Sequence, residues 1–131
     1  MQTAARPQTG QSGVALLCPE PRLRRILRLA LVADDQDVVE WDADDETPRP
    51  GVSAIVADLD SLCLDVEALV DRLKGRGIAE GAALLLISIY PLELAGLAWS
   101  GPADSLQPPF SPQTLASRVR QLLDGAGQMA R

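Results

Sequence analysis

Two carboxylates at the end of a short apolar run are the first candidates for chemistry in this sequence. Asp58 closes the run Ala54–Ala57, and Asp60 follows two residues later. Carboxylate oxygens are ligands that Mg²⁺ accepts, so Asp58 and Asp60 together with Glu20 make one conceivable metal site. The plainer alternative is structural, with Asp58 capping a following helix and Asp60 solvated in a loop. The residue types alone leave both alternatives open.

The two cysteines are the second set of reactive side chains. Cys18 directly follows the apolar run Val14–Leu17, and Cys63 lies shortly after Asp58. If the two runs form neighbouring strands, the thiols approach disulfide distance and a redox pair becomes one hypothesis. Two unrelated buried thiols are the alternative, because buried cysteine is common. Two cysteines do not make the framework of a secreted disulfide-rich protein.

Composition excludes several classes of function. The 131 residues include no histidine and a single lysine, Lys74. Without histidine there is no His-based triad or zinc site, and no glycine-rich phosphate loop or nucleophile–base pair is present, so we expect no enzyme. The net charge of −6 argues against nucleic-acid partners. No apolar run is long enough to span a membrane and no signal-peptide stretch follows Met1, so we expect no membrane partner and a cytoplasmic location.

The candidate carboxylates and thiols are positioned by strands that alternate with helices along the chain. Short continuous apolar runs predict strands that are buried on both faces. Apolar residues at helical spacing between them predict helices. The predicted strands are Val14–Leu17, Val38–Trp41, Ser53–Ala57, Ala82–Ile89 and Ser105–Gln107. The predicted helices start near Pro21, cover Leu64–Leu73 and Leu92–Trp99, and begin again at Pro112 after a Ser111 cap.

This alternation predicts an α/β fold with a doubly wound, five-stranded parallel sheet in the flavodoxin-like order 2-1-3-4-5. The acidic, proline-bearing interval 42–51 reads as a loop, so the second helix is shortened or lost. We expect a disordered tail over 1–12, one domain over 13–124 and a frayed tail over 125–131. Any ligand would bind at the switch point, where the first and third strands end.

Two stretches resemble the receiver domains of bacterial response regulators. Asp58 matches the family's phosphoryl acceptor, and Asp65 matches a later aspartate of the same loop. Ser88, at the end of the fourth strand, matches the hydroxyl that binds the phosphoryl group. Pro109-Phe110 matches the motif after the fifth strand. The resemblance covers about residues 14 to 123 and implies two-component, phosphorelay signal transduction.

Three departures from the family's pattern concern charge. Receivers carry two acidic residues after the first strand that hold Mg²⁺, where this chain has Cys18 and Pro19. Thiol sulfur is a poor Mg²⁺ ligand, and proline offers none. The family's lysine is replaced by Pro108. Since each lost charge-stabilising group costs several kcal/mol of transition-state stabilisation, we expect Asp58 to phosphorylate poorly or not at all, with weak or absent Mg²⁺ binding.

The leading hypothesis is therefore an atypical, phosphorylation-independent receiver that binds a protein partner or itself. The chain ends soon after its last helix, so we expect no attached output domain. The resemblance implies a contact surface made by the fourth helix, fifth strand and fifth helix. Its residues here are Trp99, Gln107, Arg118 and Arg120.

Two other hypotheses remain open. One is a working aspartyl phosphoacceptor with a remodelled Mg²⁺ site at Asp58, Asp60 and Glu20. The other is a small-ligand or redox sensor whose switch-point pocket is lined by Cys18, a hypothesis that rests on the resemblance alone.

Overall fold

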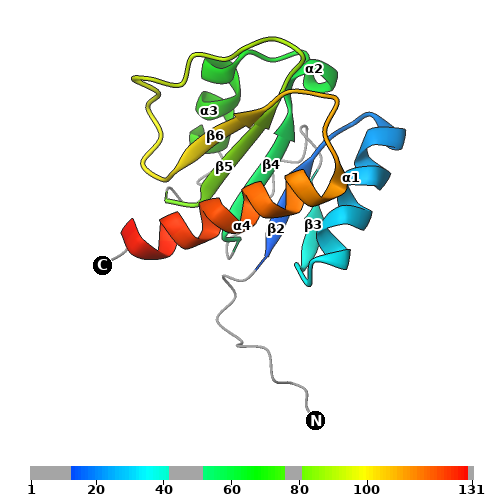
Figure 1. Cartoon of the computed structure of the whole chain (residues 1–131). Helices are drawn as coiled ribbons and strands as arrows, with labels where there is room; N and C mark the ends of the chain where they lie inside the picture. Colours follow the sequence, from blue (N-terminus) through cyan, green and yellow to red (C-terminus); the bar gives the residue numbers. More distant parts are fainter. Residues whose placement is uncertain (1–12, 42–51, 76–80, 130–131) are drawn as a thin grey trace.

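The computed structural model describes residues 13–41, 52–75 and 81–129, which form one parallel sheet with helices on both faces (Figure 1). The strands are β2 (Val14–Leu17), β3 (Val38–Glu40), β4 (Ala54–Asp58), β5 (Ala83–Ile87) and β6 (Ala103–Leu106). The helices are α1 (Pro21–Ala33), α2 (Leu59–Leu62), α3 (Val66–Gly75) and α4 (Pro112–Met129).

The strand order confirms the predicted topology. The sheet runs β3-β2-β4-β5-β6, which is the order 2-1-3-4-5 when the five strands are numbered along the chain. All four strand pairs are parallel. Every residue of β2, β4 and β5 is buried, as expected for central strands covered by helices on both sides. The carboxyl ends of β2 and β4 therefore lie side by side at the switch point.

Alternation along the strands divides the core between the two faces of the sheet. Val14 and Leu16 of β2 pack on one face with α1 and α4, whereas Ala15 and Leu17 pack on the other. The first face is covered by α1 and α4, which lie next to each other (Figure 1). The second face is covered by α3 and by the segment between β5 and β6. Whether a residue number is even or odd along β2 therefore determines which face of the sheet its side chain lies on, including at the end of the strand.

Helix α1 shows how local sequence sets its own limits. Glu20 precedes it, and its carboxylate accepts hydrogen bonds from the backbone N–H groups of Arg22 and Leu23 at 3.2 and 2.6 Å. Pro21 occupies the first helical position, where its missing N–H needs no partner. The helix ends at a C-cap Asp34, and Asp35 has a φ of 68°.

The predicted helix Leu92–Trp99 is wrong, because the segment between β5 and β6 crosses the sheet face without regular structure. Leu92, Leu94 and Leu97 pack partly against the core with short turns between them. Gly96 has a φ of 81°, which an α-helix does not allow. The indole N–H of Trp99 donates to the carbonyl of Ala82 at 2.8 Å, which fixes the far end of the segment. So short a helix is marginal without tertiary support.

Other boundaries differ from expectation in smaller ways. An unpredicted short helix, α2, directly follows β4. Helix α4 continues through Gly125 to Met129, past the predicted fraying point. The predicted tail over 1–12 and the lost helix over 42–51 fall outside the described residues. None of the helices in the described ranges combines the length and the hydropathy that a membrane span requires.

Candidate functional site

Strand register brings Cys18 and Asp58 together at the switch point. Leu17 of β2 pairs with Ala57 of β4, so the next residues of the two strands are neighbours as well. Even-numbered residues of both strands face α1 and α4, which places Cys18 and Asp58 on the same face. The Cys18 thiol lies 3.9 Å from Oδ2 of Asp58 and donates to it.

The carboxylate of Asp58 is buried, with 5% of the residue exposed. Asp58 occupies the position before α2, but its side chain makes no capping hydrogen bond, so the predicted capping role is wrong. Ser61 donates to the backbone carbonyl of Asp58 at 3.5 Å, and its hydroxyl lies 4.0 Å from the Cys18 sulfur. Asp58 is therefore enclosed by a thiol, a hydroxyl and the ends of two strands.

Cys18 is held in its neutral thiol form by the same surroundings. Only 2% of the residue is exposed. Burial, followed by the negative charge of Asp58, raises the pKa of Cys18 from 9.0 to about 11. Both cysteines are free, and Cys63 is exposed with its sulfur 3.8 Å from the carbonyl of Asp60. The two cysteines form no disulfide, so the structure gives no support to a redox pair. The alternative of two buried thiols is correct for Cys18 and wrong for Cys63.

Glu20 faces its own helix instead of the switch point. Both of its oxygens accept hydrogen bonds from the first turn of α1, and these bonds lower the pKa of Glu20. Pro19, between Cys18 and Glu20, is exposed. The two positions after Cys18 therefore supply no free carboxylate to the Asp58 site.

Asp60 joins α2 to the end of β5. Its Oδ1 accepts a hydrogen bond from the hydroxyl of Ser88 at 2.9 Å, and its Oδ2 accepts one from the backbone N–H of Ile89 at 2.8 Å. Ser88 is buried and also accepts a hydrogen bond from the N–H of Tyr90 at 3.1 Å. Asp60 is exposed, as predicted, but it is a bridging residue and not a loop residue.

The donor set does not fit the Mg²⁺ ion that the receiver resemblance implies. Mg²⁺ requires several hard oxygen ligands in octahedral geometry. Glu20 caps α1, Asp60 is bound to Ser88 and Ile89, and a thiol stands beside Asp58. Across residues 13–41, 52–75 and 81–129, no group of three or more metal-binding side chains comes together. Asp65, the later aspartate of the loop, caps α3 by accepting from the N–H of Ala68 at 2.8 Å.

No cation balances the Asp58 carboxylate in the part of the chain that the structure describes. Its one side-chain hydrogen-bond partner there is Cys18. Pro108, in the position of the family's lysine, is exposed and joined to Pro109 by a cis peptide bond. Lys74 lies in the last turn of α3, which leads away from the carboxyl edge of β4 toward the start of β5. The single lysine is thus at the opposite edge of the sheet.

The four residues of the predicted contact surface do not form one face. Trp99 is buried, and the helix that would have carried it is absent from the described residues. Gln107 donates to the carbonyl of Ile89 at 3.0 Å. Arg118 pairs with Asp104 of β6 at 3.0 Å. Arg120 is two positions further along α4 and therefore points to the other side of that helix.

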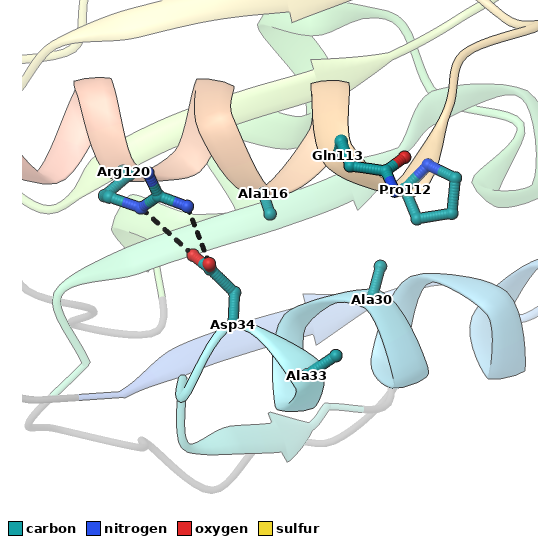
Figure 2. Close-up of a pocket in the computed structure, with 7 residues that line it drawn as sticks. All are labelled: Ala30, Ala33, Asp34, Pro112, Gln113, Ala116 and Arg120. Carbon is teal, nitrogen blue, oxygen red and sulfur yellow. Dashed lines mark hydrogen bonds and ion pairs between the residues drawn. The ribbon is translucent and has the colours of Figure 1, made fainter.

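Arg120 binds Asp34 at the end of α1, with Nε 3.2 Å from Oδ2 and a second, shorter bond to Oδ1 (Figure 2). The hydrogen bond and the charge of Asp34 raise the pKa of Arg120. This ion pair borders a groove of about 210 Å³ between α1 and α4. The other residues lining the groove are Ala30, Ala33, Pro112, Gln113 and Ala116.

A larger, open pocket of about 510 Å³ lies beside the end of β5, one strand away from the predicted switch-point position. Its lining comes from α2, from the residues leading into α3 and from the segment after β5. These residues are Leu59, Asp60, Cys63, Leu64, Asp65, Val66, Ser88, Ile89, Tyr90 and Leu92. Ile89 and Tyr90 were not among the predicted site residues, and Ile89 was placed at the end of the predicted strand Ala82–Ile89. Two large apolar side chains just beyond the continuous run Ala83–Ile87 were a usable signal.

The fold is shared with known proteins although the sequence is not. No protein-family model and no curated protein matches the chain. A CheY-like receiver domain protein from Methanospirillum hungatei matches with a TM-score of 0.65 at 14% identity, covering 91% of this chain and 98% of that one. A Francisella response regulator receiver domain matches at 0.64 and 20% identity, covering 87% and 98%. A receiver domain protein from Bacillus halodurans matches at 0.64 and 15% identity, covering 85% and 96%.

Proposed function

We propose that this chain, which has the fold of response-regulator receiver domains, is a signalling module that works without phosphorylation of Asp58. It acts in a two-component type of pathway by binding a protein partner in the cytoplasm, and it catalyses no reaction. The five-stranded parallel sheet with the order β3-β2-β4-β5-β6 and the position of Asp58 at the end of β4 support the first part of the proposal. The chemistry around Asp58 supports the second.

The observation that carries the proposal is the neutral enclosure of Asp58. Phosphoryl transfer to a carboxylate places further negative charge beside it, and cations normally offset that charge. Here the buried carboxylate of Asp58 meets the thiol of Cys18, whose pKa of about 11 keeps it uncharged at neutral pH. A thiol offers one weak hydrogen bond and no charge. The barrier to acyl-phosphate formation should therefore stay several kcal/mol above that of a site with metal and lysine.

Engagement of the neighbouring acids supports the same proposal. Both oxygens of Glu20 already accept backbone N–H groups at the start of α1. Both oxygens of Asp60 already accept hydrogen bonds from Ser88 and Ile89. Turning these carboxylates toward Asp58 to share a Mg²⁺ ion would cost those hydrogen bonds, so a phosphoacceptor that depends on such a site is disfavoured.

Treatment with acetyl phosphate tests the proposal. The protein is incubated with and without Mg²⁺, and its intact mass is followed over time next to an Asp58→Asn variant. We expect no Mg²⁺-dependent increase in mass. Stoichiometric modification that disappears in Asp58→Asn would contradict the proposal.

A restoration variant supplies the matched control. Cys18→Asp, Pro19→Asp and Pro108→Lys together place two acids and an ammonium at the positions that the receiver pattern uses. We expect this variant to gain Mg²⁺-dependent modification at Asp58. That gain would assign the loss of phosphorylation to these three positions.

A further inference from the structure

We propose that the open pocket beside the end of β5 is the docking site for a partner segment that carries a basic side chain next to an apolar one. The inference rests on the proposed function, because it names the chemistry of the protein partner. Three properties of the pocket support it: its apolar walls, the charge at its rim and its extent.

The walls of the pocket are apolar and partly unprotected. Leu59, Leu64 and Leu92 line it together with Ile89 and Tyr90. The exposed fractions of Ile89 and Tyr90 are 57% and 65%, which places them among the exposed large hydrophobic residues of the described chain. Leaving such surface in water is unfavourable by roughly 25 cal/mol per Å², so an apolar partner side chain gains by covering it.

The rim of the pocket is acidic. Asp60 and Asp65 contribute carboxylates, and none of the described residues that line the pocket is lysine or arginine. Within residues 13–41, 52–75 and 81–129, Oδ1 of Asp65 accepts a hydrogen bond from the N–H of Ala68 and Oδ2 accepts none, so Oδ2 can accept from a partner. The net charge of −6 adds to the negative potential. A lysine or arginine is attracted to this rim, and arginine also stacks favourably on a tyrosine ring such as Tyr90.

The extent of the pocket favours a peptide segment over a free amine. A volume of about 510 Å³ holds one or two side chains. Because Ile89 and Tyr90 remain largely exposed, a second residue of the same segment can pack on them while its neighbour fills the pocket. The groove between α1 and α4 lacks these features, because it is smaller, its small alanines offer little apolar contact and its Arg120 is already neutralised by Asp34.

Peptide titration into the isotope-labelled full chain tests the proposal. The probes are the acetylated, amidated tetrapeptide Leu-Arg-Leu-Lys and its acidic counterpart Leu-Glu-Leu-Glu. We expect the basic peptide to shift the backbone amide signals of Asp60–Val66 and Ser88–Leu92, and the acidic peptide to leave them unchanged. Higher salt should weaken binding because the ion pairs are exposed.

Two variants locate the contacts. Asp65→Asn should weaken the basic peptide roughly two- to five-fold, the range of an exposed ion pair, and asparagine still caps α3. Tyr90→Ala should weaken it by about the same factor or more, since it removes the exposed ring. Asp71→Asn is the matched control, because Asp71 is exposed on α3 but does not line the pocket, and it should leave binding unchanged.

Several results would overturn the proposal. These are equal binding of the acidic peptide, shifts confined to other surfaces, no effect of Asp65→Asn and Tyr90→Ala, or butylamine binding as tightly as the peptide. The last result would make the pocket a small-amine site. None of these results affects the mass measurement at Asp58. The experiments therefore show separately whether the docking site is wrong and whether Asp58 is phosphorylated.

Discussion

Asp58 and Asp60 are two residues apart in sequence, and their carboxylates have opposite surroundings. Asp58 ends β4, is buried and faces a neutral thiol. Asp60 lies in the first turn of α2, is exposed and bonds a hydroxyl and a backbone N–H at the end of β5. The first region is closed, whereas the second opens into a pocket of about 510 Å³.

This difference shows that a carboxylate at the end of β4 does not define the chemistry of the site. The side chains around the carboxylate do. The switch point between β2 and β4 still presents a carboxylate, but Cys18 supplies neither a metal ligand nor a charge. The neighbouring edge between β4 and β5 has acids, exposed apolar surface and space. We therefore expect a protein partner to bind at the open pocket beside β5, and we expect Asp58 to contribute to stability and not to binding.

The largest expected contrast is in thiol reactivity, since one cysteine lies in each region. With a pKa of about 11, only about 10⁻³ of Cys18 is thiolate at pH 8, and burial restricts access to it further. Cys63 is exposed. We expect a disulfide reagent to modify Cys63 at least about 100-fold faster than Cys18 in the native protein.

Absorbance kinetics on the wild type and on Cys63→Ser would check this expectation. The variant should lose the fast phase and keep the slow one, and denaturant should make both cysteines of the wild type react quickly. Comparable native rates for the two thiols would show that the Asp58 region is open.

The next effect is on stability at neutral pH. Cys18→Ala removes the donor to a buried carboxylate and leaves a small void, so we expect a loss of about 2–3 kcal/mol in the free energy of unfolding. Cys18→Ser keeps a hydroxyl donor and should lose less. Urea unfolding followed by the fluorescence of the buried Trp41 and Trp99 measures both losses. Adding Asp58→Asn to Cys18→Ala should recover part of the loss, and equal losses for alanine and serine would contradict a donor role.

The same thiol predicts a loss of stability in alkali. Folding raises the pKa of Cys18 from 9.0 to about 11, so the native state holds its proton more tightly than the unfolded state. This contribution is fully present below pH 9 and is lost as the pH rises to about 11. We expect a decrease of up to about 2 kcal/mol across this window that is smaller in Cys18→Ser. If the free energy of unfolding changes with pH in the same way in the wild type and in Cys18→Ser, folding does not raise the pKa of Cys18.

The smallest effect concerns the open region. Asp60→Ala removes the acceptor for Ser88 and for the N–H of Ile89, and should cost about 1 kcal/mol because these bonds are partly solvated. Amide hydrogen exchange should accelerate at Ile89, while Asp71→Ala, the exposed control on α3, should leave it unchanged. Unaltered exchange at Ile89 in Asp60→Ala would show that Asp60 does not hold the segment after β5.

Much of the fold was predictable because short-range patterns specify it. The apolar run Val14–Leu17 was predicted with its exact limits, and Pro21 and Ser111 marked the starts of α1 and α4. The segment Leu92–Trp99 was not, because its leucines suit either a helix or an extended crossing. The choice between them depends on Gly96 and on the distant carbonyl of Ala82 that binds Trp99.

The candidate site was predicted in position but not in its contacts. The sequence predicted that the ends of the first and third strands meet, but not that Cys18 contacts Asp58. That contact depends on the register in which Leu17 pairs with Ala57. The bonds of Asp60 to Ser88 and Ile89 had no sequence signal either, because they depend on the short helix α2 that the sequence pattern did not indicate. Arg120 likewise found Asp34, a partner 86 residues away in sequence.

The sequence by itself determined the alternation of strands and helices with its sheet order, the burial of the three central strands and the proline in place of a lysine at position 108, because apolar patterning and composition are local properties of the chain. The edge strands β3 and β6 proved less buried than their apolar runs predicted. The tertiary structure alone decided which acids are occupied, which cysteine is buried and where a pocket remains open. Those outcomes depend on distances between elements, and such distances are set by how helices and loops pack on the sheet.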